Sequence, residues 1–214
     1  MRTVIDRAAA MIPTPRSAIC SVVTHAGVAG VFCGAAETAW SAAADLSAER
    51  HVIRLPDRPV RQVFAVLPEM YRDLWVGAKG MYKTEPAVDD GGEVILYAPN
   101  LREVSATHGA ILRRVGYHVR DYFTARWDEV RHLPWSVLAH ATHLKGSGTY
   151  DGGVERPRIE VTLATGIGAE ECRALNLGYR DPATIDAAAF EAREDQGVLC
   201  VRRAGEYLYR RPSL

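Results

Sequence analysis

Apolar runs alternate with amphipathic stretches along this chain, which is the pattern of an α/β protein. Buried-type strands are predicted at Val63–Leu67, Glu93–Ala98, Arg158–Ala164 and Gly197–Arg202. The stretch between the first two strands has helical spacing and ends in the turn Asp89–Gly92, so this part predicts a βαβ unit with parallel strands. We therefore predict an α/β fold of three layers, with a mostly parallel sheet flanked by helices.

The first 16 residues open the domain poorly, because Pro13 and Pro15 interrupt the helical run before them. We interpret residues 1–16 as a linker or as the stump of an upstream domain, and residues 17–214 as one α/β domain. That domain is expected to begin with two strands, Ala18–Thr24 and Gly30–Cys33, followed by the alanine-rich helix Ala35–Arg50.

The middle of the chain is predicted to be helical, with one glycine-rich insertion. His108–Val130 indicates one or two helices with a break at Gly116, and Trp135–Leu144 indicates a short helix. Lys145–Pro157 is rich in glycine and is predicted to be a loop or hairpin. A further helix is expected at Ala169–Leu177.

Composition narrows the class of partner. The chain has 26 Lys and Arg against 26 Asp and Glu, so no overall charge favours nucleic acid or an anionic membrane as a partner. No apolar run approaches the roughly 20 residues that span a bilayer. The four cysteines form no CxxC pair and are interpreted as buried free thiols of a cytoplasmic protein: Cys20, Cys33, Cys172 and Cys200.

The stretch from Phe64 to Pro86 is the best candidate for a binding site. A strand ends at Pro68, a helix is expected from Glu69, and Lys79 lies on that helix between Gly77 and Gly80. The carboxyl end of a strand followed by a helix is where open α/β sheets bind ligands. Two glycines in a helix suggest close approach of another group to its backbone. The alternative is an ordinary amphipathic helix with a solvated lysine.

His140 and His143 share one helical face in the sequence AHATHLKG. This spacing occurs in metal sites, but zinc needs further ligands, which would have to come from His108, from His118 or from outside the chain. Histidines that bind the carbonyl groups of a loop are the alternative explanation. The same spacing underlies one functional hypothesis, a self-sufficient metal-dependent enzyme.

Two further segments follow predicted strands. Ser105–Gly109 lies after Glu93–Ala98, where either a functional group or a helix cap by Ser105 or Thr107 is expected. Thr165–Gly168 (TGIG) could hold an anion through its backbone N–H groups, but it lacks the full GxGxxG pattern of a dinucleotide site.

Four segments carry a resemblance to a known family. They are GVAGVFCGAAETAW, LPEMYRDLWVGAKGMYK, DDGGEVILYAP and the tryptophan that opens WSVLAHATHLKG. Together they resemble the C-terminal domain of the nickel-dependent lactate racemase (LarA) family. The resemblance implies an isomerase that racemises or epimerises 2-hydroxy acids with a nickel-pincer nucleotide. In this family a histidine takes the hydroxyl proton, and the hydride on the α-carbon goes to the cofactor and returns to either face.

The resemblance assigns roles to residues of this chain. Lys79 matches the family's catalytic lysine, which reaches the substrate, and Trp135 matches an aromatic residue that closes the active site. Val76 replaces a glutamine of the lactate enzyme, which argues against lactate itself as substrate. A larger 2-hydroxy acid, such as a sugar acid, would meet Tyr82, His140 or His143 through its extra hydroxyl groups.

The family's cofactor-tethering lysine, nickel-binding histidine and acid/base histidines belong to an N-terminal domain whose motifs are absent from this sequence. We therefore expect no metal-binding or cofactor-binding residue here, an inactive isolated chain, and an N-terminal catalytic domain as partner, in cis or as a separate chain. Apolar surface that this partner covers could also produce a homodimer. The alternative is a stand-alone module that binds a small hydroxy acid without catalysis.

Overall fold

The computed structural model describes residues 2–212 and divides the chain into two compact units, Met1–Val52 and Ile53–Leu214. The first unit, called unit 1, is a β-hairpin with helices. Its elements are α1 (Arg2–Ala10), β1 (Ser17–Thr24), β2 (Gly27–Ala35) and α2 (Ala36–His51). The first strand of the hairpin and α2 were predicted within one residue, whereas β2 begins three residues earlier and ends two residues later than predicted. The stretch interpreted as a linker or stump contains α1, and the first compact unit extends to Val52.

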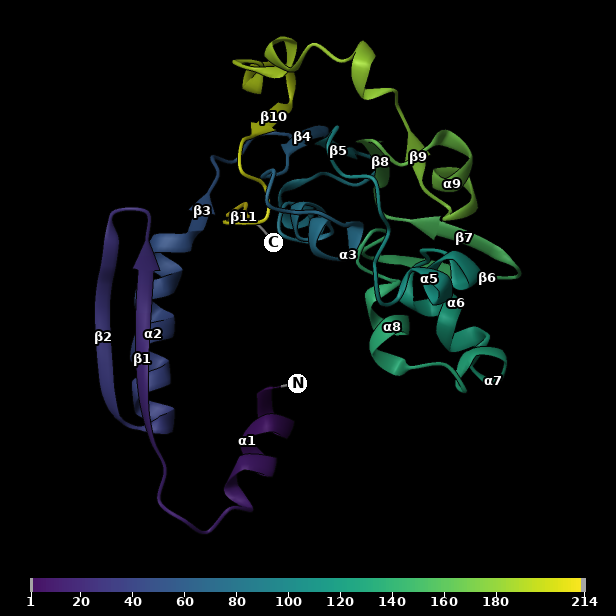
Figure 1. Ribbon diagram of the computed structural model, residues 1–214. Coiled ribbons are helices and arrows are strands. Elements are labelled where there is room, and N and C mark those ends of the chain that lie inside the picture. Colours follow the sequence, from purple (N-terminus) through teal and green to yellow (C-terminus); the bar gives the residue numbers. More distant parts are fainter. Residues whose placement is uncertain (1, 213–214) are drawn as a thin grey trace. The chain divides into compact units, whose positions relative to one another are not determined.

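Unit 2 holds a five-stranded sheet in the order β10–β4–β5–β8–β9, and each neighbouring pair is parallel (Figure 1). The strands are β4 (Gln62–Val66), β5 (Glu93–Ala98), β8 (Glu160–Thr165), β9 (Gly178–Tyr179) and β10 (Val198–Val201). The predicted α/β class with a parallel sheet is confirmed.

Helices cover one face of this sheet, and the predicted glycine-rich insertion is the hairpin of β6 and β7. The helices and remaining short elements are α3 (Leu74–Gly77), α4 (Lys79–Tyr82), η1 (Glu85–Ala87), α5 (Gly109–Val115), α6 (Arg120–Ala125), α7 (Trp127–Val130), α8 (Trp135–His140), β6 (Gly148–Asp151), β7 (Val154–Pro157) and α9 (Ala169–Ala174). Strand β11 (Leu208–Arg210) forms a two-stranded sheet with β3 (Val52–Arg54).

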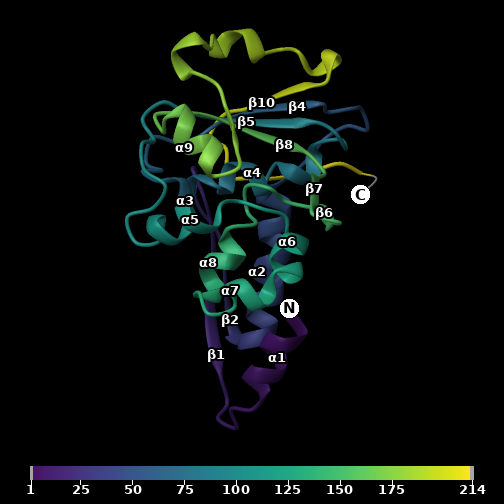
Figure 2. The ribbon, with the colours of Figure 1, turned by 90° about the vertical axis from the view of Figure 1, so that its right-hand side faces the viewer.

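The other face of the sheet is covered by short 3-10 turns instead of long helices. These are η2 (Pro182–Thr184), η3 (Ala187–Phe190) and η4 (Glu194–Gln196), and Figure 2 shows this segment on the side of the sheet opposite α4. Phe64 of β4 stacks on Phe190 at 4.1 Å between ring centroids, which anchors the segment. Asp181 and Asp186 each accept a hydrogen bond from a backbone N–H two residues on, which favours turns.

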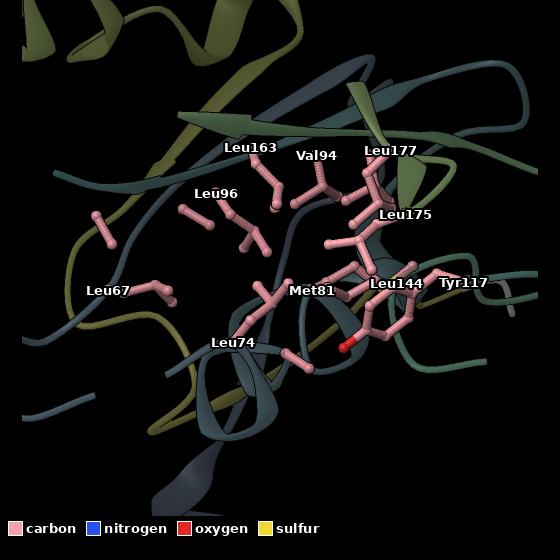
Figure 3. Close-up of a cluster of buried hydrophobic side chains, with 14 of the residues drawn as sticks. Leu67, Leu74, Met81, Val94, Leu96, Tyr117, Leu144, Leu163, Leu175 and Leu177 are labelled. Carbon is pink, nitrogen blue, oxygen red and sulfur yellow. The ribbon is translucent and has the colours of Figure 1, made fainter. Parts of the chain in front are cut away.

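The main core lies between the sheet and the helical face. Val94, Leu96 and Leu163 of the sheet point toward Leu74 and Met81 of α3 and α4 (Figure 3). All five side chains are buried. This packing holds α3 and α4 against the sheet and so positions the residues of the candidate site.

Candidate functional site

The candidate site begins where β4 ends. Asp73 accepts a hydrogen bond from Val76 N at 3.0 Å and caps α3, so the helix begins at Leu74. The expectation of a helix from Glu69 was wrong, because the N–H of Tyr71 bonds to the carbonyl of Pro68 in a turn. Lys79 therefore follows the carboxyl end of a parallel strand, where ligand sites of α/β sheets are found.

Lys79 lies on α4 with a partly exposed side chain. Its Nζ atom lies 5.8 Å from the ring centroid of Tyr71, which is a weak cation–π contact. Within residues 2–212 its ammonium group has no hydrogen-bond or ion-pair partner. One turn on, Lys83 donates to Glu206 O at 3.4 Å, and burial followed by the charge of Lys79 lowers the pKa of Lys83. The unpaired charge of Lys79 is therefore free to bind an anion.

The two glycines beside Lys79 serve the core. A Cβ atom on Gly80 would lie 2.4 Å from Leu67 Cδ2 and 3.0 Å from Leu96 Cδ2. A Cβ on Gly77 would lie 3.0 Å from Leu101 Cδ1. The groups that approach these glycines are thus leucine side chains, and close packing of helix against sheet explains the glycines without a ligand.

Three rings, those of Trp75 in α3, His108 and His140, form a cluster. His140 lies parallel to Trp75 at 3.8 Å between centroids, and His108 lies 4.5 Å from the same indole. His140 Nε2 donates to the carbonyl of Trp75 at 2.9 Å, so its proton is on Nε2. Burial lowers the pKa of His140 to about 4, which keeps the ring neutral. Its Nδ1 atom is buried without a partner among the described residues, as is the hydroxyl of Tyr117.

Tyr82 and His143 line an open cavity of about 310 Å³. Their ring centroids are 5.0 Å apart, and His143 is 4.8 Å from His140. Burial raises the pKa of Tyr82 and lowers the pKa of His143, so both rings are favoured in their neutral forms. The remaining lining residues are Glu85, Arg120, Thr142, Gly146, Ser147 and Gly148.

A tight turn forms one wall of this cavity. Gly146 has a φ of +65°, and a Cβ there would lie 2.3 Å from Glu85 Oε1. Glu85 accepts a hydrogen bond from Ser147 N at 2.8 Å and lies 3.7 Å from the guanidinium of Arg158. The glycine is therefore required by the close approach of the Glu85 carboxylate.

Trp135 stands apart from these groups. Its side chain is 66% exposed, its Nε1 donates to the carbonyl of Arg131 at 3.0 Å, and its ring lies 5.4 Å from that of Trp127. Exposed indoles of this kind can close over a ligand, but no contact joins Trp135 to Lys79, Tyr82 or the two histidines within residues 2–212.

The other sequence hypotheses meet simpler structural explanations. Within residues 2–212, no group of three or more His, Cys, Asp or Glu side chains is arranged to hold a metal ion. Ser105 accepts a hydrogen bond from His108 N in the turn before α5, but the N-cap of that helix is His108, so the expected helix cap by Ser105 or Thr107 is not formed. Thr165 Oγ1 accepts from Ile167 N within the TGIG segment. Cys33 is exposed, so the expectation of four buried thiols was wrong.

Sequence reasoning missed two groups on the insertion side of the site. Lys145 is only 7% exposed, and its ammonium group has no hydrogen-bond or ion-pair partner within the described part of the chain. Glu155 accepts hydrogen bonds from Val119 N, His118 and Asn176, which outweigh burial and lower the pKa of Glu155. Glu155 has no local sequence signal, because its three hydrogen-bond partners are distant from it in the chain.

Comparison with solved structures identifies the fold. The chain is similar to a protein from Thermotoga maritima, with a TM-score of 0.85 and 31% identity over 98% of this chain and 53% of that one. It is also similar to the lactate racemase apoprotein of Thermoanaerobacterium thermosaccharolyticum, with a TM-score of 0.63 and 16% identity over 91% of this chain and 46% of that one. No family model and no curated protein sequence matches.

Both matches have the same extent: this chain spans about half the length of each solved structure. The resemblance suggested by the sequence is therefore confirmed for the fold, which is that of about half of a lactate racemase. No helix of residues 2–212 is long and apolar enough to cross a membrane.

Proposed function

We propose that this chain, whose fold is that of half a lactate racemase, is the substrate-side part of a 2-hydroxy acid racemase or epimerase that uses a nickel-pincer nucleotide. The observation that carries the proposal is the unpaired ammonium group of Lys79, held after the carboxyl end of β4. A substrate with a carboxylate next to a hydroxyl group needs such a cation. We place the assembled protein in the cytoplasm.

Lys79 has two roles in this proposal. Its ammonium group binds the carboxylate or the C2 oxygen of the substrate, and it stabilises negative charge that develops on that oxygen during the reaction. The site is partly shielded by the ring of Tyr71 and by the backbone at Gly205, which strengthens a charge interaction relative to water. Trp135 closes over the bound acid.

The cavity beside Tyr82 and His143 suits a substrate larger than lactate. Its volume of about 310 Å³ and its polar lining offer hydrogen bonds to the hydroxyl groups of a sugar acid. His140 is buried behind this wall and holds His143 and Trp75 in place. Val76, which replaces the glutamine of the lactate enzyme, agrees with this substrate class.

The nickel cofactor does not fit the side chains of this chain as ligands, since residues 2–212 hold no suitable group of donors. In the proposal the cofactor is bound by a partner domain, in cis or as a separate chain. The comparisons support such a partner because this chain spans only about half of each similar structure.

Replacing Lys79 tests the proposal. In the assembled enzyme, Lys79→Ala should lower kcat about 10²–10³-fold, the usual loss when one stabilising group of the transition state is removed. The melting temperature should change little, because the Lys79 side chain is partly exposed and forms no ion pair in residues 2–212. Lys83→Ala is the matched control and should keep most of the turnover.

Two outcomes would contradict this assignment. Equal losses of kcat in the two lysine variants would mean that Lys79 has no specific role, and a large drop in melting temperature for Lys79→Ala would mark it as structural. Tight binding of a hydroxy acid by the chain, with no turnover in any assembly, would favour the stand-alone binding module.

A further inference from the structure

Unit 1 lacks a core of its own. Among residues 2–52 only Val22, Ala39 and Ala43 are buried, and α1 has no buried residue. Most of the exposed large apolar side chains of residues 2–212 nevertheless lie in this smaller unit. A single two-stranded hairpin is at most marginally stable in water without further packing. Unit 1 therefore exposes apolar side chains that would be expected to pack against another surface.

Helix α2 covers only one face of the hairpin. Val22 pairs with Gly30 on that face, and a Cβ on Gly30 would lie 2.7 Å from Leu46 Cδ2 of α2. Because strand side chains alternate, the next positions point away from the helix. This outer face is apolar, and its four large side chains are 56–79% exposed: Ile19, Val23, Val28 and Val31.

The register gathers these side chains into one patch. Val23 lies opposite Val28, and Ile19 and Val31 face Cys33 and Ser21 on the same side of the hairpin. The strands contain no Lys, Arg, Asp, Glu or Pro. Exposed hairpins are normally protected by such residues against pairing with other chains. An apolar face without this protection is typical of a surface that another protein segment covers.

We propose that this outer face of the β1–β2 hairpin is the docking surface for the cofactor-binding half of the proposed isomerase. The inference rests on the proposed function for the identity of the occupant. The similar Thermotoga maritima protein matches 98% of this chain, unit 1 included, yet only 53% of its own length is matched. The Thermotoga maritima protein therefore contains, besides the matching hairpin, a further part about as long as this chain. A folded segment with an apolar, uncharged contact surface fits the patch best.

The test uses the full chain and a defined probe. The part of the Thermotoga maritima protein outside the match is made as a separate polypeptide, and its binding to this chain is measured by analytical ultracentrifugation and titration calorimetry. Wild-type chain should form a one-to-one complex. The double variant Ile19→Lys/Val31→Lys should bind at least about tenfold more weakly, because two charges would be buried without partners.

The control is Val154→Lys, at an exposed valine of the other two-stranded hairpin, β6–β7. It should leave binding unchanged. If the double lysine variant loses its hairpin by circular dichroism, Ile19→Thr/Val31→Thr keeps β-branched residues and tests the same face.

Three results would overturn the inference: no binding of the probe by wild-type chain, equally tight binding by the double variant, or a wild-type homodimer that the double variant dissociates. The last would assign the face to a second copy of this chain. A complex that forms through the hairpin but isomerises no 2-hydroxy acid would instead overturn the proposed function alone. Isomerisation that survives the double variant would overturn the docking inference alone.

Discussion

Burial of His140 should make the free energy of unfolding depend on pH. In the unfolded chain a histidine binds a proton below about pH 6.5, whereas burial lowers the pKa of His140 in the folded chain to about 4. The unfolded state therefore binds more protons between these values. The free energy of unfolding should fall as the pH decreases from about 6.5 to about 4, by up to about 3 kcal/mol from this residue.

The variant His140→Phe isolates this contribution. It keeps an aromatic ring against Trp75 but cannot titrate, so the difference in unfolding free energy between wild type and variant should shrink as the pH is lowered. Urea denaturation at a series of pH values measures this. Burial also lowers the pKa values of His118 and His143, but these two residues are the same in both proteins. Parallel stability curves, or an NMR titration of His140 near pH 6.5, would contradict the assignment.

The surroundings of some residues could be predicted from the sequence and those of others could not. At Ser105 the sequence favours either a functional group or a helix cap, whereas the structure shows a turn in which Ser105 accepts from His108 N and His108 itself is the N-cap of α5. The burial of His140 and Lys145 was not foreseen. Their surroundings come from helices and a hairpin far apart in sequence, and no local pattern specifies them.

Gly77 at the end of α3 and Gly80 in α4 let these two helices pack closely against neighbouring leucines. Gly80→Ala would place a Cβ 2.4 Å from Leu67 Cδ2, whereas Gly77→Ala would meet its nearest atom at 3.0 Å. Overpacking of this kind costs about 1–3 kcal/mol, while replacement of a helical glycine by alanine gains roughly 1 kcal/mol. We expect Gly80→Ala to be destabilised in chemical denaturation and Gly77→Ala to be close to wild type.

The variants Gly77→Ala and Gly80→Ala can also be compared for turnover. Gly80→Ala should lower the turnover of the assembled enzyme through displacement of Lys79, the neighbouring residue on α4. Equal stability of the two alanine variants would show that Leu67 moves aside freely and that Gly80 is not required for packing.

Elements were predicted best where the pattern was local. The strands β4, β5, β8 and β10 were found within one or two residues, since each is a short apolar run between turn signals. The start of α3 was misplaced because Glu69 looked like a first helical residue, while the actual cap is Asp73. The 3-10 turns at 182–196 have no simple periodic pattern in the sequence. Their conformation is fixed by tertiary contacts such as that of Phe190 with Phe64.

The two units of the molecule differ in how many of their side chains are buried. Unit 2 contains the parallel sheet, both hydrophobic clusters and all the candidate site residues, whereas unit 1 has three buried residues in its described part. The division at Val52 was not apparent from the sequence, because the hydrophobic pattern of the hairpin looks like that of any half-buried sheet. Only the structure of unit 1 shows that α2 covers one face of this hairpin and leaves its outer face exposed within the unit.

We propose that this chain supplies the substrate side of a 2-hydroxy acid isomerase. The most direct measurement is chiral chromatography of enantiopure lactate and of larger 2-hydroxy acids, including sugar acids. The acids are incubated with this chain, with a cofactor-loaded partner half, and with both. We predict that the opposite configuration at C2 forms only when both are present, and that Lys79→Ala abolishes it. Isomerisation by this chain alone, or none by the assembled protein with any acid of the series, would contradict the claim.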